Sequence, residues 1–394
     1  MKRLGAFFAI ILLVTAGCGG NRQGNRTDGI ITVDVTKNYP QRELILQDFM
    51  DVEYIALETG GEFYTQGLVL AIGKEIILVK NQVNDGDIFV FDKTGKGIRK
   101  FNRKGQGGEE YVTLKEVFLD EDREEIFVCD NSSRKTIVYD FYGKFKRSFR
   151  FNEGARYQDV YNYDRDCFIW WNSAFEYSDE SVDMPSFFIS SKQDGSNIKE
   201  IRIPVENRKS TRISSSSNPE TAFRHFLEYR AIIPFLDQWI LFEISSDTMY
   251  RYLPDHSVQP FLVRTPSIQI QSMTDVFLFP NVFSDRYYFV TTVKNDFDFA
   301  TMSSSPTNPL MYDRQEKSMF TCVVYNDDYS NKRRGHVNMA MKPLSGEIAL
   351  YMRLNADELV ENYEKGELKV KLKEIAVTLK EESNPVIMLV KHKK

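Results

Sequence analysis

The stretch Ile88-Phe89-Val90-Phe91-Asp92-Lys93-Thr94-Gly95 returns in altered form as Ile137-Val138-Tyr139-Asp140-Phe141-Tyr142-Gly143. An offset of 48 residues pairs Phe91 with Tyr139, Asp92 with Asp140, Gly95 with Gly143, and further on Phe101 with Phe149. A repeat of about 40 to 50 residues, with short β-branched and aromatic runs and an Asp-x-x-Gly turn, is typical of a propeller blade. The repeat therefore predicts a β-propeller and decides the fold more firmly than any other feature.

Six segments have the character of a third blade strand followed by a turn: Ile88–Asp92, Thr136–Asp140, Ser186–Ser191, Thr248–Tyr252, Phe320–Tyr325 and Val386–Lys391. Six apolar runs precede them as second strands: Glu75–Val79, Glu125–Cys129, Cys167–Trp171, Trp239–Ile244, Arg286–Val293 and Glu347–Met352. Their patterns are typical of sheets buried on both faces. The predicted fold class is all-β, a single six-bladed β-propeller over residues 30–394, whose later blades are spread apart by inserted loops such as Asn295–Lys317.

The last blade carries a short helical insertion between its second and third strands. Ala356–Val360 and Leu368–Leu379 are predicted to be helices, with Asn355 as the N-cap and a break at Gly366. The chain then ends one strand short of a full blade, and a closed ring must cover that edge. We expect the strand-like segment Ile30–Val35 to supply the missing outer strand.

The N-terminus has the pattern of a targeting segment. Lys2 and Arg3 precede an apolar run that is too short to span a bilayer, and small residues then lead to Cys18. The segment Thr15-Ala16-Gly17-Cys18 resembles the lipobox of bacterial lipoproteins, although Leu is usual at the position of Thr15. The resemblance implies a signal peptide over residues 1–17 and lipidation of Cys18, followed by a flexible tether over residues 18–29. The alternative is an ordinary signal peptide with a coincidental cysteine.

Composition excludes several function classes. Loss of Lys2 and Arg3 would make the chain two units more negative than its formal charge of −5, so nucleic acid is not an expected partner. The remaining cysteines (Cys129, Cys167 and Cys322) lie far apart in strand-like runs, which favours free thiols over a disulfide framework. With four scattered His and no C-x-x-C pair, the sequence predicts no metal site and no cofactor.

The segment Phe101-Asn102-Arg103-Lys104-Gly105-Gln106-Gly107-Gly108-Glu109-Glu110-Tyr111 resembles the inter-blade loop of NHL-type propellers. Together with the lipobox, Tyr54-Ile55-Ala56-Leu57-Glu58-Thr59 and Ser383-Asn384-Pro385-Val386-Ile387-Met388-Leu389-Val390, it makes the chain similar to the six-bladed β-propeller lipoproteins of Gram-negative gut anaerobes. The resemblance implies a fold and a cellular address, a lipid anchor in the outer membrane, on its periplasmic or outer side. It implies no particular reaction.

Binding residues are expected where ring symmetry gathers equivalent loops on one face. These loops offer Asn81, Arg103, Asp130, Arg134, Trp171 and Tyr177 as candidate ligand-binding residues. A structural alternative stands beside each group: Asp and Asn can satisfy their own turn backbone, and both Trp170 and Trp171 can be core residues. Side chains of this mixture suit polar ligands with a flat apolar face, such as sugars.

The sequence therefore predicts a lipid-anchored binding module for a glycan, a peptide or an envelope protein, without catalysis of its own. The alternative is a hydrolase or lyase that works in the central channel, because propellers host both. No Gly-x-Ser-x-Gly elbow or sialidase-type box is present. A cluster of Asp, Glu, Arg and Tyr side chains converging in the channel would favour the enzyme.

Overall fold

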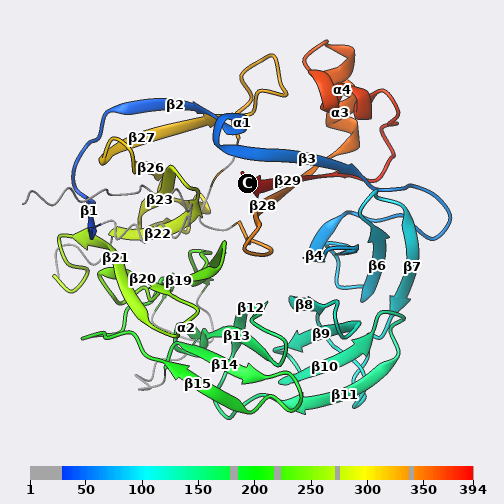
Figure 1. Ribbon diagram of the computed structural model, residues 1–394, viewed down its shortest axis with the longest axis horizontal. Helices are drawn as coiled ribbons and strands as arrows, with labels where there is room; N and C mark the ends of the chain where they lie inside the picture. The colour runs from blue at the N-terminus through cyan, green and yellow to red at the C-terminus, as the bar shows by residue number, and fades with distance from the viewer. Residues whose placement is uncertain are drawn as a thin grey trace, which may run out of the picture.

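A computed structural model describes residues 29–177, 185–216, 223–270, 276–335, 337 and 341–393. Within them, six sheets of three to five strands surround a central channel, so the predicted six-bladed propeller is confirmed (Figure 1). The signal peptide, Cys18 and nearly all of the tether lie outside these residues. Among the helices that the structure describes, none has the length and apolar character needed to cross a membrane.

Blades 1 to 3 are regular four-stranded antiparallel sheets. Blade 1 consists of β4 (Leu68–Ile72), β5 (Ile76–Lys80), β6 (Asp87–Asp92) and β7 (Gly97–Asn102). Blade 2 consists of β8 (Glu116–Asp120), β9 (Glu125–Asp130), β10 (Lys135–Asp140) and β11 (Phe145–Arg150). Blade 3 consists of β12 (Tyr157–Asn162), β13 (Cys167–Asn172), β14 (Phe187–Ser191) and β15 (Asn197–Ile201).

The Asp-x-x-Gly turn of the repeat joins the third and fourth strands. Asp92 accepts hydrogen bonds from the backbone N–H groups of Thr94 (2.8 Å) and Lys96 (3.0 Å), and Asp140 binds its own turn in the same way. Gly95 has φ +88° and Gly143 has φ +76°. The left-handed conformation at this turn explains why the repeat keeps a glycine there.

Blades 4 and 5 each carry a fifth strand from the N-terminal segment. Blade 4 consists of β18 (Ile232–Phe235), β19 (Gln238–Phe242), β20 (Thr248–Tyr252), β21 (Val258–Thr265) and β1 (Ile31–Asp34). Blade 5 consists of β22 (Val276–Phe283), β23 (Tyr287–Lys294), β26 (Thr307–Asp313), β27 (Ser318–Tyr325) and β2 (Gln41–Ile45). Both β1 and β2 pair parallel to the outermost strand of their blade.

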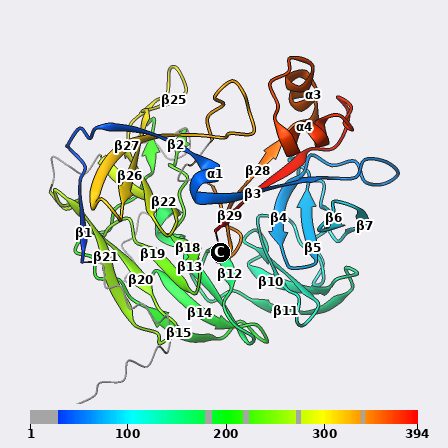
Figure 2. The same cartoon turned by 45° about the horizontal axis from the view of Figure 1, so that its top comes forward.

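Blade 6 closes the ring with β28 (Ile348–Leu354), β29 (Val386–His392) and β3 (Met50–Ala56). The expectation that Ile30–Val35 closes the ring is wrong, because β1 pairs with β21 and β3 is the strand that pairs with β29. The reason lies in the connections. Only a short segment separates β3 from blade 1, whereas β1 lies far enough upstream to reach blade 4. Residues 31–56 thus run as a belt along the outer edges of three consecutive blades (Figure 2).

The third strand of blade 5 also differs from expectation. Phe320–Tyr325 belongs to β27, the fourth strand, and the third strand β26 lies inside the segment predicted to be an inserted loop. Pro309 in β26 argues against a strand in sequence reasoning. It is tolerated here beside Thr291 of β23.

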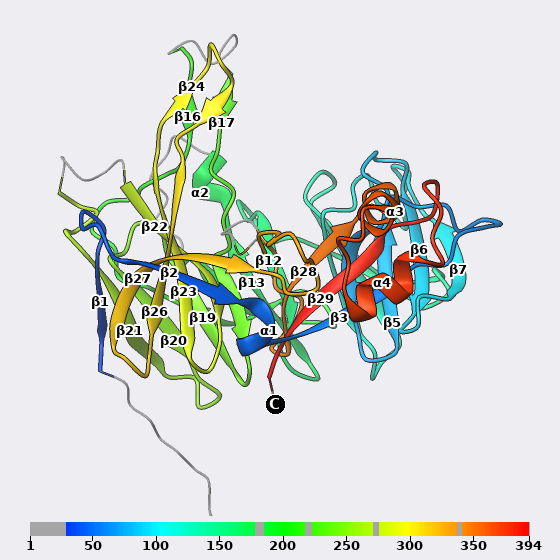
Figure 3. The same cartoon turned by 90° about the horizontal axis from the view of Figure 1, so that it is seen from above.

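Two hairpins project from one face of the ring. They are β16 (Ile213–Ser214) with β17 (Arg224–His225), and β24 (Phe297–Asp298) with β25 (Ser303–Ser304). The two hairpins lie side by side (Figure 3), and the His225 ring stacks on Phe297 with centroids 4.0 Å apart, which joins the two insertions.

Four short helices complete the fold of the described residues. α3 (Ala356–Glu364) and α4 (Val370–Ala376) form the helical insertion predicted in blade 6, with Gly366 at φ +70° between them. Asn355 holds the N-cap position, but its side chain makes no capping hydrogen bond. α1 (Leu46–Phe49) lies between β2 and β3, and α2 (Ala174–Tyr177) follows β13.

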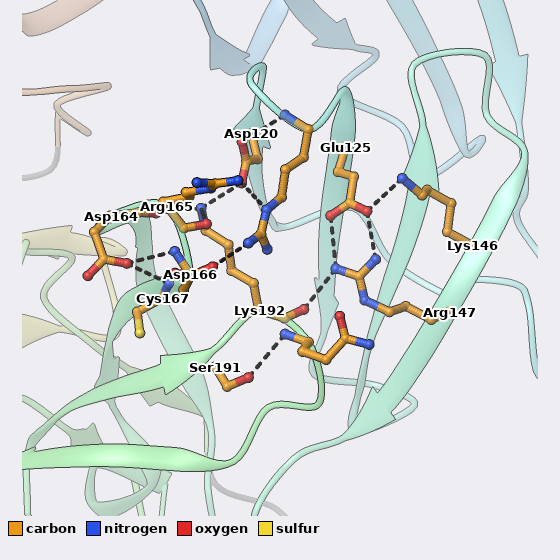
Figure 4. A network of polar contacts seen from close by, with 12 residues as sticks. Asp120, Glu125, Lys146, Arg147, Asp164, Arg165, Asp166, Cys167, Ser191 and Lys192 are labelled. Atoms are coloured by element: carbon orange, nitrogen blue, oxygen red, sulfur yellow. Dashed lines mark hydrogen bonds and ion pairs between the residues drawn. The ribbon is translucent and has the colours of Figure 1, made fainter.

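Charged side chains fasten blade 2 to blade 3 on the face that bears the turns between first and second strands, here called the turn face (Figure 4). The fully buried Lys192 ammonium donates to Asp120 (2.6 Å) and to the backbone carbonyls of Asp164 (2.6 Å) and Arg165 (3.2 Å). Arg147 makes a bidentate ion pair with Glu125 at 2.7 and 2.8 Å. Every N–H of the buried ammonium is satisfied, which a buried charge requires.

Candidate functional site

The predicted binding loops extend over the opposite face, here called the loop face, which carries the connections between second and third strands and between blades. The side chain of Asn81 is fully used in hydrogen bonds with neighbouring residues. Its side-chain oxygen accepts from Thr65 (3.2 Å) and from the Gln66 backbone (2.9 Å), while its amide donates to Asp85 (2.6 Å). It therefore organises the blade 1 loop and offers little to a ligand.

Asp130 is buried and fully engaged. Its carboxylate accepts from the backbone N–H groups of Val112 (2.8 Å) and Ser132 (3.0 Å) and from the hydroxyls of Thr113 (2.8 Å) and Ser133 (2.6 Å). Burial acts to raise the pKa of Asp130, but these hydrogen bonds outweigh it and lower the pKa below its usual value. The geometry fits the structural alternative, in which Asp130 holds its turn and the inter-blade loop together.

The two candidate arginines differ in their engagement. The Arg103 guanidinium donates from Nε to the backbone carbonyl of Gly143 at 2.7 Å and so helps to join blades 1 and 2. Arg134 is exposed, and its guanidinium makes no hydrogen bond or ion pair with any residue that the structure describes. Of the two, Arg134 is the one available to a ligand.

The two candidate aromatic residues differ in exposure to solvent. Trp171 is only 2% exposed and packs against Phe175 and Tyr229, so it cannot stack on a sugar at the rim. Tyr177 is 44% exposed, with the Arg156 guanidinium 3.9 Å from its ring centroid. Trp170 is also buried, so both tryptophans are core residues.

A pocket of about 470 Å³ lies on the loop face between blades 2 and 3, and we call it the blade 2–3 pocket. Its walls come from the loop after β9, the inter-blade loop before β12, the segment around α2, the residues before β14 and the insertion after β15. The lining residues are Asn131, Ser132, Arg134, Gly154, Ala155, Arg156, Asn172, Ala174, Phe175, Tyr177, Pro185, Ser186 and Arg208. Two predicted residues, Arg134 and Tyr177, thus meet in one concave site.

Sequence reasoning missed three polar residues of this pocket, Arg156, Asn172 and Arg208. Arg156 lies in an unremarkable inter-blade segment, and no local pattern marks it. Arg208 opens a serine-rich insertion, and it reaches back to Glu243 (2.9 Å) and Ser186 (3.0 Å). Asn172 directly follows the two tryptophans, so its position at the end of a second strand was the available signal.

A second cavity, of about 700 Å³, occupies the central channel and opens on the turn face. Lys342 and Tyr161 are among the residues that line it. Lys342 pairs with the buried Glu116 at 2.9 Å. The Tyr161 hydroxyl is buried without a hydrogen-bond partner among the described residues.

Asp159 belongs to the same group of charges and is fully buried. It accepts from the backbone N–H of Ala231 (2.6 Å) and pairs with Arg230 (3.3 Å). Burial raises the pKa of this carboxyl despite the Arg230 charge. The channel region therefore does gather Asp, Glu, Arg and Tyr side chains. The buried Asp159 and Glu116 are paired within the protein, whereas the exposed side chains of Asp122 and Asp237, which line the cavity, have no hydrogen bond or ion pair with a described residue.

Solved structures show the same fold in other proteins. A Bacteroides fragilis protein described as exported is 15% identical with a TM-score of 0.59, over 93% of this chain and 100% of its own. A member of the DUF4221 family from Bacteroides vulgatus is 9% identical with a TM-score of 0.45, over 88% and 99%. Virginiamycin B lyase from Staphylococcus aureus is 9% identical with a TM-score of 0.38, over 87% and 100%. At 15% identity, the similarity to the Bacteroides fragilis structure shows a shared fold and nothing more. The TM-scores of the other two structures are too low to support a conclusion.

No curated protein is similar enough in sequence to count as a relative. Residues 30–391 match the family described as "Domain of unknown function (DUF4934)". The matched range runs from just before β1 to near the end of β29, so it includes the N-terminal belt and all six blades. The chain therefore belongs to the DUF4934 domain family.

Proposed function

We propose that this protein is a lipid-anchored binding module of the cell envelope, which holds a glycan, a peptide or an envelope protein on its loop face. One observation carries the proposal: the blade 2–3 pocket combines a volume of about 470 Å³ with the exposed side chains of Arg134 and Tyr177 and the half-buried side chain of Arg156. Small-molecule sites are concave, of about 300–1,000 Å³, and set a few polar groups among apolar ones. The rigid blades beneath keep such a site largely preformed.

The cellular address rests on the N-terminal sequence, where an apolar run and small residues precede Cys18 and a polar segment follows. The exported description of the Bacteroides fragilis protein agrees with this placement. A lipid on Cys18 would tether the propeller to the outer membrane.

The proposal is tested with the chain from Asn25 onward on an array of glycans and peptides. Immobilised protein with Arg134→Ala serves as the matched negative. Selective binding that falls in this variant supports the proposal. Binding that is unchanged in Arg134→Ala but lost after changes on the turn face would show that the ligand site lies on the turn face, which would contradict the proposal.

A hydrolase or lyase in the channel is the second candidate. The observation in its favour is the buried group formed by Asp159, Arg230, Glu116 and Lys342. Against it, the two buried carboxylates of this group are held by cations or by backbone N–H groups, which does not suit a general acid or base. Turnover in a panel of glycoside, ester and peptide substrates that disappears in Asp159→Asn, with the fold intact, would reverse this choice.

A further inference from the structure

We infer that the blade 2–3 pocket selects an acidic saccharide, whose carboxylate or sulfate group is bound by Arg134, Arg156 and Asn172. The inference rests on the proposed function, because it names the ligand class of the same pocket. It follows from charge, from an available amide donor and from the backbone at Arg134.

The pocket is positively charged in a chain of net negative charge. Among the residues that the structure describes, three arginines line it and no Asp or Glu does, although the whole chain has a formal charge of −5. Glu243 offsets the charge of Arg208 at 2.9 Å. Arg134 and Arg156 have no acidic partner among the described residues. Two uncompensated guanidinium groups in one concavity favour an anionic ligand.

The arginines are held so that they can donate. The guanidinium of Arg156 lies 3.9 Å from the ring centroid of Tyr177, and that of Arg208 lies 5.2 Å from the centroid of Phe175. Stacking uses the flat face of the Arg156 guanidinium and leaves its N–H edge available for a bidentate carboxylate or sulfate. Arg208, by contrast, already donates to Glu243 and Ser186. The aromatic residues of the pocket therefore orient cations, in place of the sugar stacking expected of Trp171.

Asn172 adds an amide donor. Its side-chain oxygen accepts from the backbone N–H groups of Arg156 (3.0 Å) and Ala174 (3.2 Å). These bonds fix which end of the amide is the donor, and its Nδ2 has no partner among the described residues. Asn172 lines the pocket and its Nδ2 is not a buried atom, so this donor is available to a ligand there.

The backbone conformation at Arg134 also supports the inference. The repeat offset of 48 residues places Arg134 opposite Gly86 of blade 1. Both positions have positive φ, +53° at Arg134 and +89° at Gly86. An L-residue in this conformation is strained, by contrast with glycine. Blade 2 therefore keeps an arginine at a position where the fold itself favours glycine.

A saccharide fits this pocket better than a peptide. The site is compact and has no exposed strand edge among its walls, which extended peptides use for backbone pairing. The Ser132 hydroxyl adds a neutral group beside the cationic donors, as a hydroxylated acid requires. Carboxylate and sulfate share the recognising chemistry, and the probes below separate them.

The test measures binding of trigalacturonate, its methyl-esterified form, a sulfated trisaccharide and a Glu-rich peptide by calorimetry. The chain from Asn25 onward is compared with Arg134→Gly, Arg156→Gln and the control Arg165→Gln. Arg165 is an exposed arginine on the turn face, so its loss changes the net charge equally. We expect an acidic saccharide to bind about tenfold to a hundredfold more weakly to both pocket variants and unchanged to the control.

Arg134→Gly separates binding from folding, because glycine relieves the strained φ. Its thermal midpoint should equal or exceed that of the parent while its affinity falls. Equal binding of the acidic and esterified sugars, or stronger binding of the peptide, would overturn the inference but leave a binding module in place. Failure of every array ligand to bind would defeat the proposed function as well.

Discussion

Phe101 of blade 1 lies directly against Gly143 of blade 2: a Cβ built on Gly143 would sit 2.5 Å from the Phe101 ring. The same relationship recurs one blade on, where a Cβ on Gly195 would sit 2.4 Å from the ring of Phe149. The Phe and the Gly that define the 48-residue repeat are thus partners across blades. Blades 1 and 2 each supply the ring that covers the glycine turn of the next blade.

Gly143→Ala should therefore destabilise the protein. The added methyl group meets the Phe101 ring, and φ +76° strains any L-residue. We expect a loss of about 1–3 kcal/mol in the free energy of unfolding, measured by urea denaturation. Gly108→Ala is the control, because a Cβ there meets nothing within 4 Å. Equal stability of both variants would mean that the turn adapts freely.

Removal of the closing strand should open the ring. A chain that begins at Tyr39 lacks only β1 and should stay monomeric with a lower melting temperature. A chain that begins at Gly60 also lacks β2, α1 and β3, and β3 is the partner of β29 over Met50–Ala56. It exposes a sheet edge and should aggregate. Size-exclusion chromatography distinguishes the two, and a stable monomer from Gly60 onward would contradict the closure by β3.

Lys192→Met should cost about 3–5 kcal/mol of stability, because it leaves Asp120 as a buried charge without its ammonium partner. Combining it with Asp120→Leu should recover part of the loss. The double-mutant cycle is measured by chemical denaturation, with the exposed Lys144→Met as control. Additive losses would show that the two side chains are energetically independent.

Glu125 should make stability depend on pH. Burial opposes its ionisation, but hydrogen bonds from Arg147 and Lys146 prevail and lower its pKa to about 2, from 4.5. A depressed folded pKa stabilises the protein above pH 4.5, and this contribution is lost as the pH falls toward 2.

At neutral pH, the free energy of unfolding of the parent should exceed that of Glu125→Gln by about 1–2 kcal/mol. This value is reduced because both cations are partly exposed to solvent. Thermal melts between pH 7 and about 2.5 follow the decline of that difference. The exposed Glu153→Gln is the matched control. A difference that stays constant with pH would rule out the ion pair as its source.

Cys18→Ala should release the protein from membranes, since no lipid can then attach to residue 18. Membrane fractionation and electrophoretic mobility measure the change, with Cys129→Ala as a control for loss of a buried thiol. Fractionation and mobility like those of the parent would argue for an ordinary signal peptide.

The sequence alone determined the propeller and its blade number, because each blade repeats the same local requirements. Phe91 and Tyr139 mark buried strands, and Gly95 and Gly143 mark turns that need a positive φ, so a linear pattern suffices to find them. The helices of blade 6 followed equally from local capping and breaking residues.

Only the tertiary structure decided which segments become neighbours around the ring. Ile31–Asp34 and Met50–Ala56 have similar strand patterns, and the path of the chain assigns them to different blades. Arg134, Arg156 and Asn172 come from separate connections, and no local pattern states that they share a pocket. Trp171 looked like a rim residue, yet α2 and the following insertion bury it. The Phe101–Gly143 contact between blades recurs with the repeat and is marked in the sequence, whereas the contacts that form the pocket depend on irregular connections and leave no periodic signal in the chain.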